Sequence, residues 1–298
     1  MTTLSDDELA KLVLRRDEDN ANYATLIRLR ESIGPVACVR RMLALFERRE
    51  SPDLCEKSWN AALTICLTDE QPEMNLESSR LWTDAILEAM KDDSPEIRAR
   101  AAGALGFGLS GEQFTPSINS ALMTGLADAS VEVRFESGQT LQQSGRQAIP
   151  YLTTALLDER YQRPHANPND RCSSVWDILF TLDGILGRQD TTPGDRDASA
   201  CAVGGFLETR FPDDGLDCMD VWKAGDTLGE HIGGREALAT LSALIDHPDP
   251  RVRASVAHGL SHLKEPEARE RLHLLLHDGD EGVRNEAAKY LNRPPGSG

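Results

Sequence analysis

Four histidines near the carboxyl end have a spacing that suits metal binding, and they form the pairs His258/His262 and His273/His277. Residues four apart share one face of a helix, so each pair presents two imidazoles side by side. Imidazoles with nearby carboxylates are typical ligands of a zinc-type site, and the nearby acids are Glu265, Glu270 and Asp278. We expect both pairs to fall off the apolar stripes of their helices, on the solvent side. The sequence therefore favours no metal site and leaves these histidines as candidates only.

A long turn at residues 158–171 is the second place where polar chemistry gathers. Enlarged turns of repeat proteins lie on one edge and often carry binding residues. We predict a partner-binding surface from this turn and two tryptophans that follow enlarged turns: Tyr161, Arg163, His165, Asn167, Asp170, Arg171, Trp176 and Trp222. The alternative is that the turn is a tolerated insertion and the tryptophans fill gaps in the core.

The elements that position these residues repeat along the chain. Residues 244–260 (LIDHPDPRVRASVAHGL) and 275–291 (LLHDGDEGVRNEAAKYL) share a capping acid, a Val-Arg pair and a closing Leu. An Asp cap followed by Pro at the first helical position starts a helix. Ile97-Arg98 and Val133-Arg134 repeat the pattern, with 36 residues between those arginines and 31 between Arg253 and Arg284. Periods of this size are typical of helical solenoids.

The pattern resembles the HEAT-repeat family, in particular its short bacterial HEAT-like (PBS-lyase-type) variety. The resemblance implies an all-α, right-handed α-solenoid of about eight helical hairpins, armadillo-like in type. It also implies a structural ladder of paired acids and arginines between hairpins, formed by Asp92, Arg98, Asp128, Arg134, Asp246, Arg253, Asp278 and Arg284.

We expect residues 1–292 to form one solenoid domain, with an amino-terminal cap hairpin over 1–34 and a disordered tail over 293–298. Residues 158–171 and 187–197 read as irregular loops, and 187–197 is the expected position of a hinge. Cys38, Cys55 and Cys66 fall at core positions, and none of the six cysteines forms a CxxC pair, which favours a reducing compartment. The amino terminus has no apolar run of signal-peptide length, so we expect a cytoplasmic protein.

The formal net charge is −17. Nucleic acids and anionic membranes attract clusters of Lys and Arg, so we expect neither as a partner. We predict a non-catalytic scaffold, adaptor or regulator without a cofactor, which binds a protein with a basic segment through an acidic concave face and the 158–171 edge. Two alternatives stay open: a metal-dependent enzyme or sensor built on the carboxyl-terminal histidines, and a lyase-like module for a small molecule or pigment. The deoxyhypusine hydroxylases resemble this chain in size and repeat number, but their His-Glu dipeptides are absent and Glu230-His231 is reversed.

Overall fold

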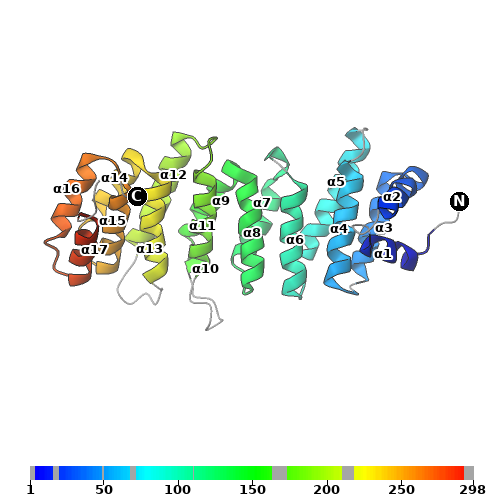
Figure 1. Cartoon of the computed structure of the whole chain (residues 1–298), viewed down its shortest axis with the longest axis horizontal. Coiled ribbons are helices and arrows are strands. Elements are labelled where there is room, and N and C mark those ends of the chain that lie inside the picture. The colour runs from blue at the N-terminus through cyan, green and yellow to red at the C-terminus, as the bar shows by residue number, and fades with distance from the viewer. Residues whose placement is uncertain are drawn as a thin grey trace. The chain divides into compact units, whose positions relative to one another are not determined.

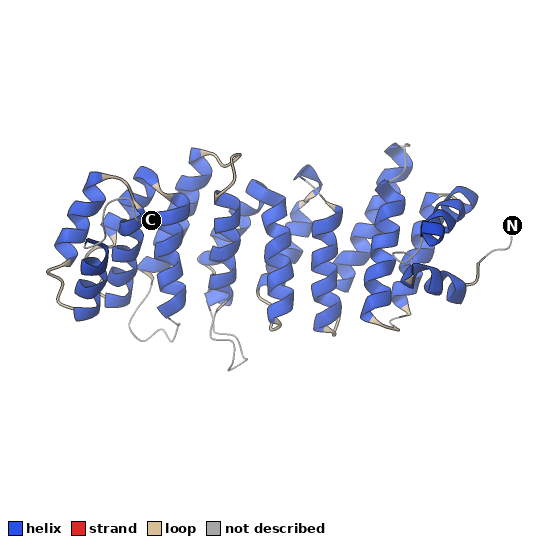
Figure 2. Cartoon of the chain, in the orientation of Figure 1, coloured by secondary structure: helices blue, strands red, loops and turns tan. Residues whose placement is uncertain are grey.

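The structure, a computed structural model of the whole chain, describes residues 4–15, 20–48, 50–67, 72–109, 111–162, 173–209 and 218–291. Nearly all of them lie in helices joined by short turns (Figure 2). The predicted all-α fold of stacked helical hairpins is therefore confirmed. None of the described helices combines the length and the apolar character that a membrane span needs.

The chain forms two compact units. The first comprises Met1–Gly125 and Phe135–Thr140, and the second comprises Leu126–Arg134 and Leu141–Gly298. Helix α8 contributes residues to both. The organisation as one domain stays a prediction, and the expected hinge at 187–197 lies inside the second unit.

The first unit opens on helix α1, and the cap hairpin over 1–34 stays a prediction. The Ser5 hydroxyl accepts a hydrogen bond from the Glu8 amide at 3.3 Å, and the Glu8 carboxylate accepts one from the Ser5 amide at 2.8 Å. This capping box starts α1 where the sequence indicates. Helices α3 and α5 are neighbours in one layer, while α1, α4 and α6 follow one another in the other. The helix bounds are α1 Asp6–Leu14, α2 Asn20–Ile33, α3 Pro35–Glu47, α4 Pro52–Leu67, α5 Pro72–Ala89, α6 Pro95–Gly108, α7 Pro116–Leu126 and α8 Val131–Ser144 (Figure 1).

The core of the first unit contains the side chains of Trp59 and Trp82, both almost fully buried. Cys38 and Cys55 are buried free thiols, as predicted, whereas the side chain of Cys66 lies outside the described residues. Burial raises the pKa of the Cys38 thiol to about 11, because the low-dielectric core disfavours the thiolate.

The second unit also has two layers. Helices α11, α13, α15 and α17 follow one another in one layer, and α9, α12 and α14 in the other, with α16 packed on α15 and α17. The bounds are α9 Ile149–Leu156, α10 Glu159–Gln162, α11 Ser174–Leu186, α12 Pro193–Glu208, α13 Cys218–Asp226, the π-helix η3 Thr227–Ile232, α14 Gly234–Ala243, α15 Pro250–His262, α16 Pro266–Leu275 and α17 Glu281–Leu291.

Two predicted loops are shorter than expected. The end of 187–197 is helical, because Thr192 and Asp195 form a capping box and Pro193 occupies the first position of α12. The start of 158–171 contains the single-turn helix α10. The predicted tail at 293–298 lies outside the described residues.

Candidate functional site

A buried group of charged side chains lies between α11 and α13 in the second unit. The Lys223 ammonium nitrogen is 2.6 Å from Asp183 Oδ2 and 2.7 Å from Asp226 Oδ2. Burial raises the pKa of Asp183. Burial alone would lower the pKa of Lys223, but hydrogen bonds to the two carboxylates outweigh it and raise this pKa overall. Two carboxylates therefore share one ammonium, which balances the charge of one of them.

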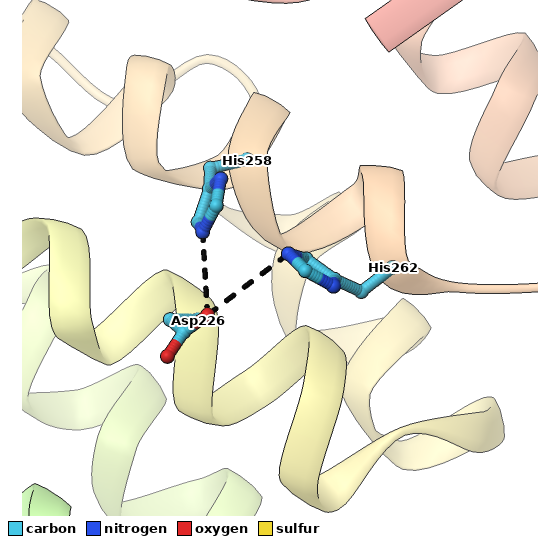
Figure 3. Close-up of side chains that lie close together, drawn as sticks. All are labelled: Asp226, His258 and His262. Atoms are coloured by element: carbon cyan, nitrogen blue, oxygen red, sulfur yellow. Dashed lines mark hydrogen bonds and ion pairs between the residues drawn. The ribbon is translucent and has the colours of Figure 1, made fainter. Parts of the chain in front are cut away.

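The second oxygen of Asp226 faces two imidazoles from α15. Asp226 Oδ1 lies 3.3 Å from His258 Nε2 and 3.9 Å from His262 Nε2 (Figure 3). Burial alone would raise the pKa of Asp226, but hydrogen bonds with His258 and Lys223 outweigh it and hold this pKa far below the usual range. Asp226 is therefore an ionised carboxylate with one oxygen on Lys223 and the other toward the histidines.

The far nitrogens of both imidazoles face oxygen atoms. His258 Nδ1 is 2.5 Å from the Tyr290 hydroxyl of α17, and His262 Nδ1 is 3.9 Å from Glu230 Oε2 of the π-helix. The Trp222 ring also stacks on His258, with ring centroids 4.2 Å apart and planes 28° apart. His258 is thus held on two sides and buried, whereas His262 remains partly exposed.

Glycines bring these helices close enough for the cluster to form. A Cβ on Gly229 would lie 2.1 Å from the carbonyl oxygen of Gly259, and a Cβ on Gly225 would lie 2.3 Å from that of Ser255. The Ser255 hydroxyl donates a hydrogen bond to the Val221 carbonyl at 2.6 Å across the same contact. Only residues without a Cβ permit this approach, so the glycines allow the side chains beside them to contact the facing helix.

The arginines of the predicted ladder bind the turn before their own helix. Guanidinium Nη1 atoms donate to paired main-chain carbonyls at Asp92 and Asp93 for Arg98, Asp128 and Ala129 for Arg134, His247 and Pro248 for Arg253, and Asp278 and Gly279 for Arg284. Two of them also bind an acid of a following hairpin, as Arg134 binds Asp177 and Arg253 binds Asp278.

One member of the predicted ladder was assigned to the wrong position. Asp246 is exposed, and the neighbouring His247 takes the place that Asp92, Asp128 and Asp278 hold in other repeats. His247 Nδ1 accepts a hydrogen bond from the Asp249 amide at 3.1 Å, as Asp278 Oδ1 accepts one from the Asp280 amide at 2.8 Å. The geometry needs an acceptor six residues before the arginine, and Asp246 is seven before.

The predicted partner surface is only partly described. Tyr161 is buried in α10, because this helix packs on α9 and α11, so its ring does not form an exposed contact. Trp176 is half-buried in the first turn of α11, and Trp222 on α13 is exposed. The remaining members lie outside the described residues: Arg163, His165, Asn167, Asp170 and Arg171.

The expectation that both histidine pairs face solvent was wrong for His258, which is buried. The structure joins His258 and His262 to Asp226, whereas His273 and His277 are exposed and belong to neither group of possible metal ligands among the described residues. The pattern of the sequence did not predict four members of this group: Asp183, Lys223, Asp226 and Tyr290. The available signal was a set of ionisable residues on apolar helix faces, where Lys223 and Asp226 share a face at a spacing of three.

Comparisons with known proteins agree with this architecture. A family model of HEAT repeats matches residues 83–166 and 222–292, together more than half of the chain. No curated protein matches the chain. The crystal structure of Kap121p is similar to it with a TM-score of 0.50 and 13% identity, over 96% of this chain but 37% of that one. At this identity the likeness shows the fold alone.

Two further solved structures are similar at lower scores. Human deoxyhypusine hydroxylase in complex with glycerol has a TM-score of 0.34 and 17% identity, over 96% of this chain and 94% of that one. A designed armadillo repeat protein in complex with the peptide (KR)4 has a TM-score of 0.32 and 16% identity, over 85% and 98%.

Proposed function

Since the chain belongs to the HEAT-repeat family, we propose that it is a non-catalytic protein-binding scaffold or regulator whose partner presents a basic segment. Stacked hairpins offer long continuous surfaces, and proteins of this architecture use them to hold extended segments of other proteins. The proposal concerns the layer of α11, α13, α15 and α17 in the second unit.

The observation that carries the proposal is that two adjacent helices, α11 and α13, expose large apolar side chains. Phe180 of α11 and Met219 and Trp222 of α13 are 49%, 43% and 39% exposed. Phe, Trp and Met are enriched in the cores of protein interfaces, and Trp is frequent among the residues that dominate binding energy. We call Phe180, Met219 and Trp222 the apolar patch.

The charge of the chain supports a basic partner. The formal net charge is −17, and the exposed Glu230 lies on the π-helix that follows α13 in the chain. A negative potential steers Lys- and Arg-rich partners toward the surface and speeds their association. Binding of this kind weakens as salt rises, because exposed charges are screened within about 8–10 Å.

Selection from a random peptide display library tests the proposal. The Phe180→Ser variant removes one ring from the apolar patch. Leu274→Ser is a matched control, because Leu274 is 57% exposed and lies on α16, outside the layer of α11, α13, α15 and α17. We expect enriched peptides to combine Lys or Arg with apolar residues, to bind the wild type and Leu274→Ser alike, and to bind Phe180→Ser about tenfold more weakly.

Salt titration separates the two parts of the proposal. Loss of affinity between low and moderate salt would support the basic segment, whereas salt-insensitive binding through the apolar patch would contradict it. The predicted 158–171 edge is tested by replacing residues 163–171, which follow α10, with a Gly-Ser linker; we expect weaker peptide binding. Failure to enrich any peptide, or equal binding by Phe180→Ser, would contradict the protein-binding proposal itself.

A further inference from the structure

The group of Asp226, His258 and His262 has a geometry that the protein-binding proposal does not use. Asp226 Oδ1, His258 Nε2 and His262 Nε2 all lie within 4.8 Å of one another. These are three ligand atoms from two helices, α13 and α15, that glycines bring into close contact. We propose that they bind a divalent transition-metal ion of the zinc class, with one coordination position left open.

The two distances from the carboxylate oxygen to the imidazole nitrogens are close to those of a tetrahedral site. Zinc bonds to imidazole nitrogen and carboxylate oxygen are about 2.0–2.1 Å long, which places neighbouring ligands of a tetrahedron about 3.4 Å apart. The carboxylate oxygen lies 3.3 Å from His258 Nε2 and 3.9 Å from His262 Nε2. The side chain of His262 is 30% exposed, and its Nε2 must move closer to the carboxylate oxygen for these two distances to become equal.

The outer partners of both imidazoles fit the same assignment. Metal-binding histidines use the second ring nitrogen to hydrogen bond an oxygen, which fixes the ring and its tautomer. His258 Nδ1 lies at hydrogen-bond distance from the Tyr290 hydroxyl, and His262 Nδ1 faces the Glu230 carboxylate at an ion-pair distance of 3.9 Å. Both Nε2 atoms consequently point to one carboxylate oxygen, as Figure 3 shows.

Lys223 determines which of two neighbouring groups takes the ion. A second group of possible ligands comprises Asp183, Asp226 and His231. There the Lys223 ammonium already lies 2.6 Å and 2.7 Å from the two carboxylates, so the position of a cation is filled. The same contact leaves Asp226 a single oxygen, Oδ1, for a metal, and Asp183 balances the charge of Lys223.

The donor set indicates the class of ion. Two imidazoles and one carboxylate are typical of zinc sites with an open fourth position, and they suit other borderline divalent metals such as cobalt and nickel. Calcium and magnesium prefer oxygen ligands alone. The exposed edge of His262, at 30% of its side-chain surface, gives the ion a path from solvent.

Calorimetric titration of zinc into the full chain, freed of any oligohistidine tag and treated with a chelator, tests the site. We expect one equivalent with a Kd tighter than about 10 µM. His262→Ala and Asp226→Asn should weaken binding by more than about 100-fold, because loss of outer partners alone costs about 10–100-fold. The matched control is the double variant His273→Ala/His277→Ala, which removes an exposed pair of the same spacing and should bind like the wild type.

Cobalt supplies a second readout that does not depend on the variants. Tetrahedral Co²⁺ absorbs visible light strongly, and we expect this band in the wild type and its displacement by zinc. Tyr290→Phe should keep the stoichiometry and lower the affinity about tenfold. A Kd weaker than about 10 µM, absence of the tetrahedral band, or an equal loss in the control variant would overturn the site.

Discussion

Arg253 and Asp278 join two consecutive hairpins of the second unit through a bidentate ion pair. Arg253 Nε donates to Asp278 Oδ2 at 2.7 Å, and Nη2 donates to Oδ1 at 2.8 Å. The remaining nitrogen, Nη1, donates to the carbonyls of His247 and Pro248. One guanidinium therefore donates hydrogen bonds both to the carbonyls of the turn before α15 and to the carboxylate that opens the next turn.

This arrangement predicts a large loss of stability for Arg253→Ala. The side chains of Arg253 and Asp278 are 16% and 8% exposed, so the variant removes a hydrogen-bond donor from a mostly buried carboxylate and from two main-chain carbonyls. We expect a fall of about 2–4 kcal/mol in the free energy of unfolding, measured by urea unfolding.

Arg253→Lys should retain only part of the stability lost in Arg253→Ala, because an ammonium group cannot form the two parallel hydrogen bonds of the planar guanidinium. The control is Lys91→Ala, whose ion pair with Glu88 is more than two-thirds exposed on both sides, with an expected change below about 0.5 kcal/mol. Equal losses in Arg253→Ala and Lys91→Ala would contradict the structural role of the ion pair.

The same pair makes part of the stability dependent on pH. The hydrogen bond from Arg253 lowers the pKa of Asp278, although burial opposes the shift. A carboxyl group whose pKa is lowered by folding adds stability above its unfolded pKa of about 3.9, and that stability is lost as the pH falls through the folded pKa. We expect the difference in unfolding free energy between the wild type and Asp278→Asn to be constant above about pH 5 and to shrink toward pH 3. Urea unfolding at several pH values measures it, and a gap that does not change with pH would count against the prediction.

Much of the fold is readable from the sequence because each helix carries its own start signal. Capping boxes, such as Ser5 with Glu8, and N-caps followed by proline, such as Asp249-Pro250, act within a few residues. Periodic apolar side chains determine which face of the helix is buried. The Thr192-Pro193 start of α12 follows the same rule, although it was placed inside a predicted loop. Its capping partner Asp195 lies three residues on, which is the usual spacing.

The cluster was less predictable because it depends on contacts between helices. Histidine spacing identifies His258 and His262 as sharing one face, but nothing local pairs them with Asp226, which is 32 residues from His258. The meeting depends on Gly225, Gly229 and Gly259, which allow two backbones to approach. A sequence pattern tells which side chains share a helix face, but not how close the next helix lies.

The glycine contact itself predicts a sharp difference between two substitutions. Gly229→Ala would place a Cβ 2.1 Å from the carbonyl oxygen of Gly259, so the helices must separate, whereas a Cβ on Gly279 meets nothing within 4 Å. We expect Gly229→Ala to lower the free energy of unfolding by about 1–3 kcal/mol and Gly279→Ala to change it by less than about 1 kcal/mol. Thermal unfolding compares the two. Similar melting temperatures would mean that the helices tolerate a wider separation.

The corrected ladder position gives the last prediction. His247 is buried, and its Nδ1 accepts the Asp249 amide, whereas Asp246 is exposed. The two aligned repeats already place His247 opposite Asp278, so the acceptor six residues before the arginine is the informative feature.

We expect His247→Ala to lower the free energy of unfolding by about 1–2 kcal/mol, because a buried amide loses its acceptor. His247→Asp restores an acceptor of the kind used by the other repeats and should recover most of the loss, while Asp246→Ala should stay within about 0.5 kcal/mol of the wild type. Urea unfolding of the three variants checks this order. If Asp246→Ala were as damaging as His247→Ala, the ladder would run through Asp246 after all, and the spacing of six would lose its physical basis.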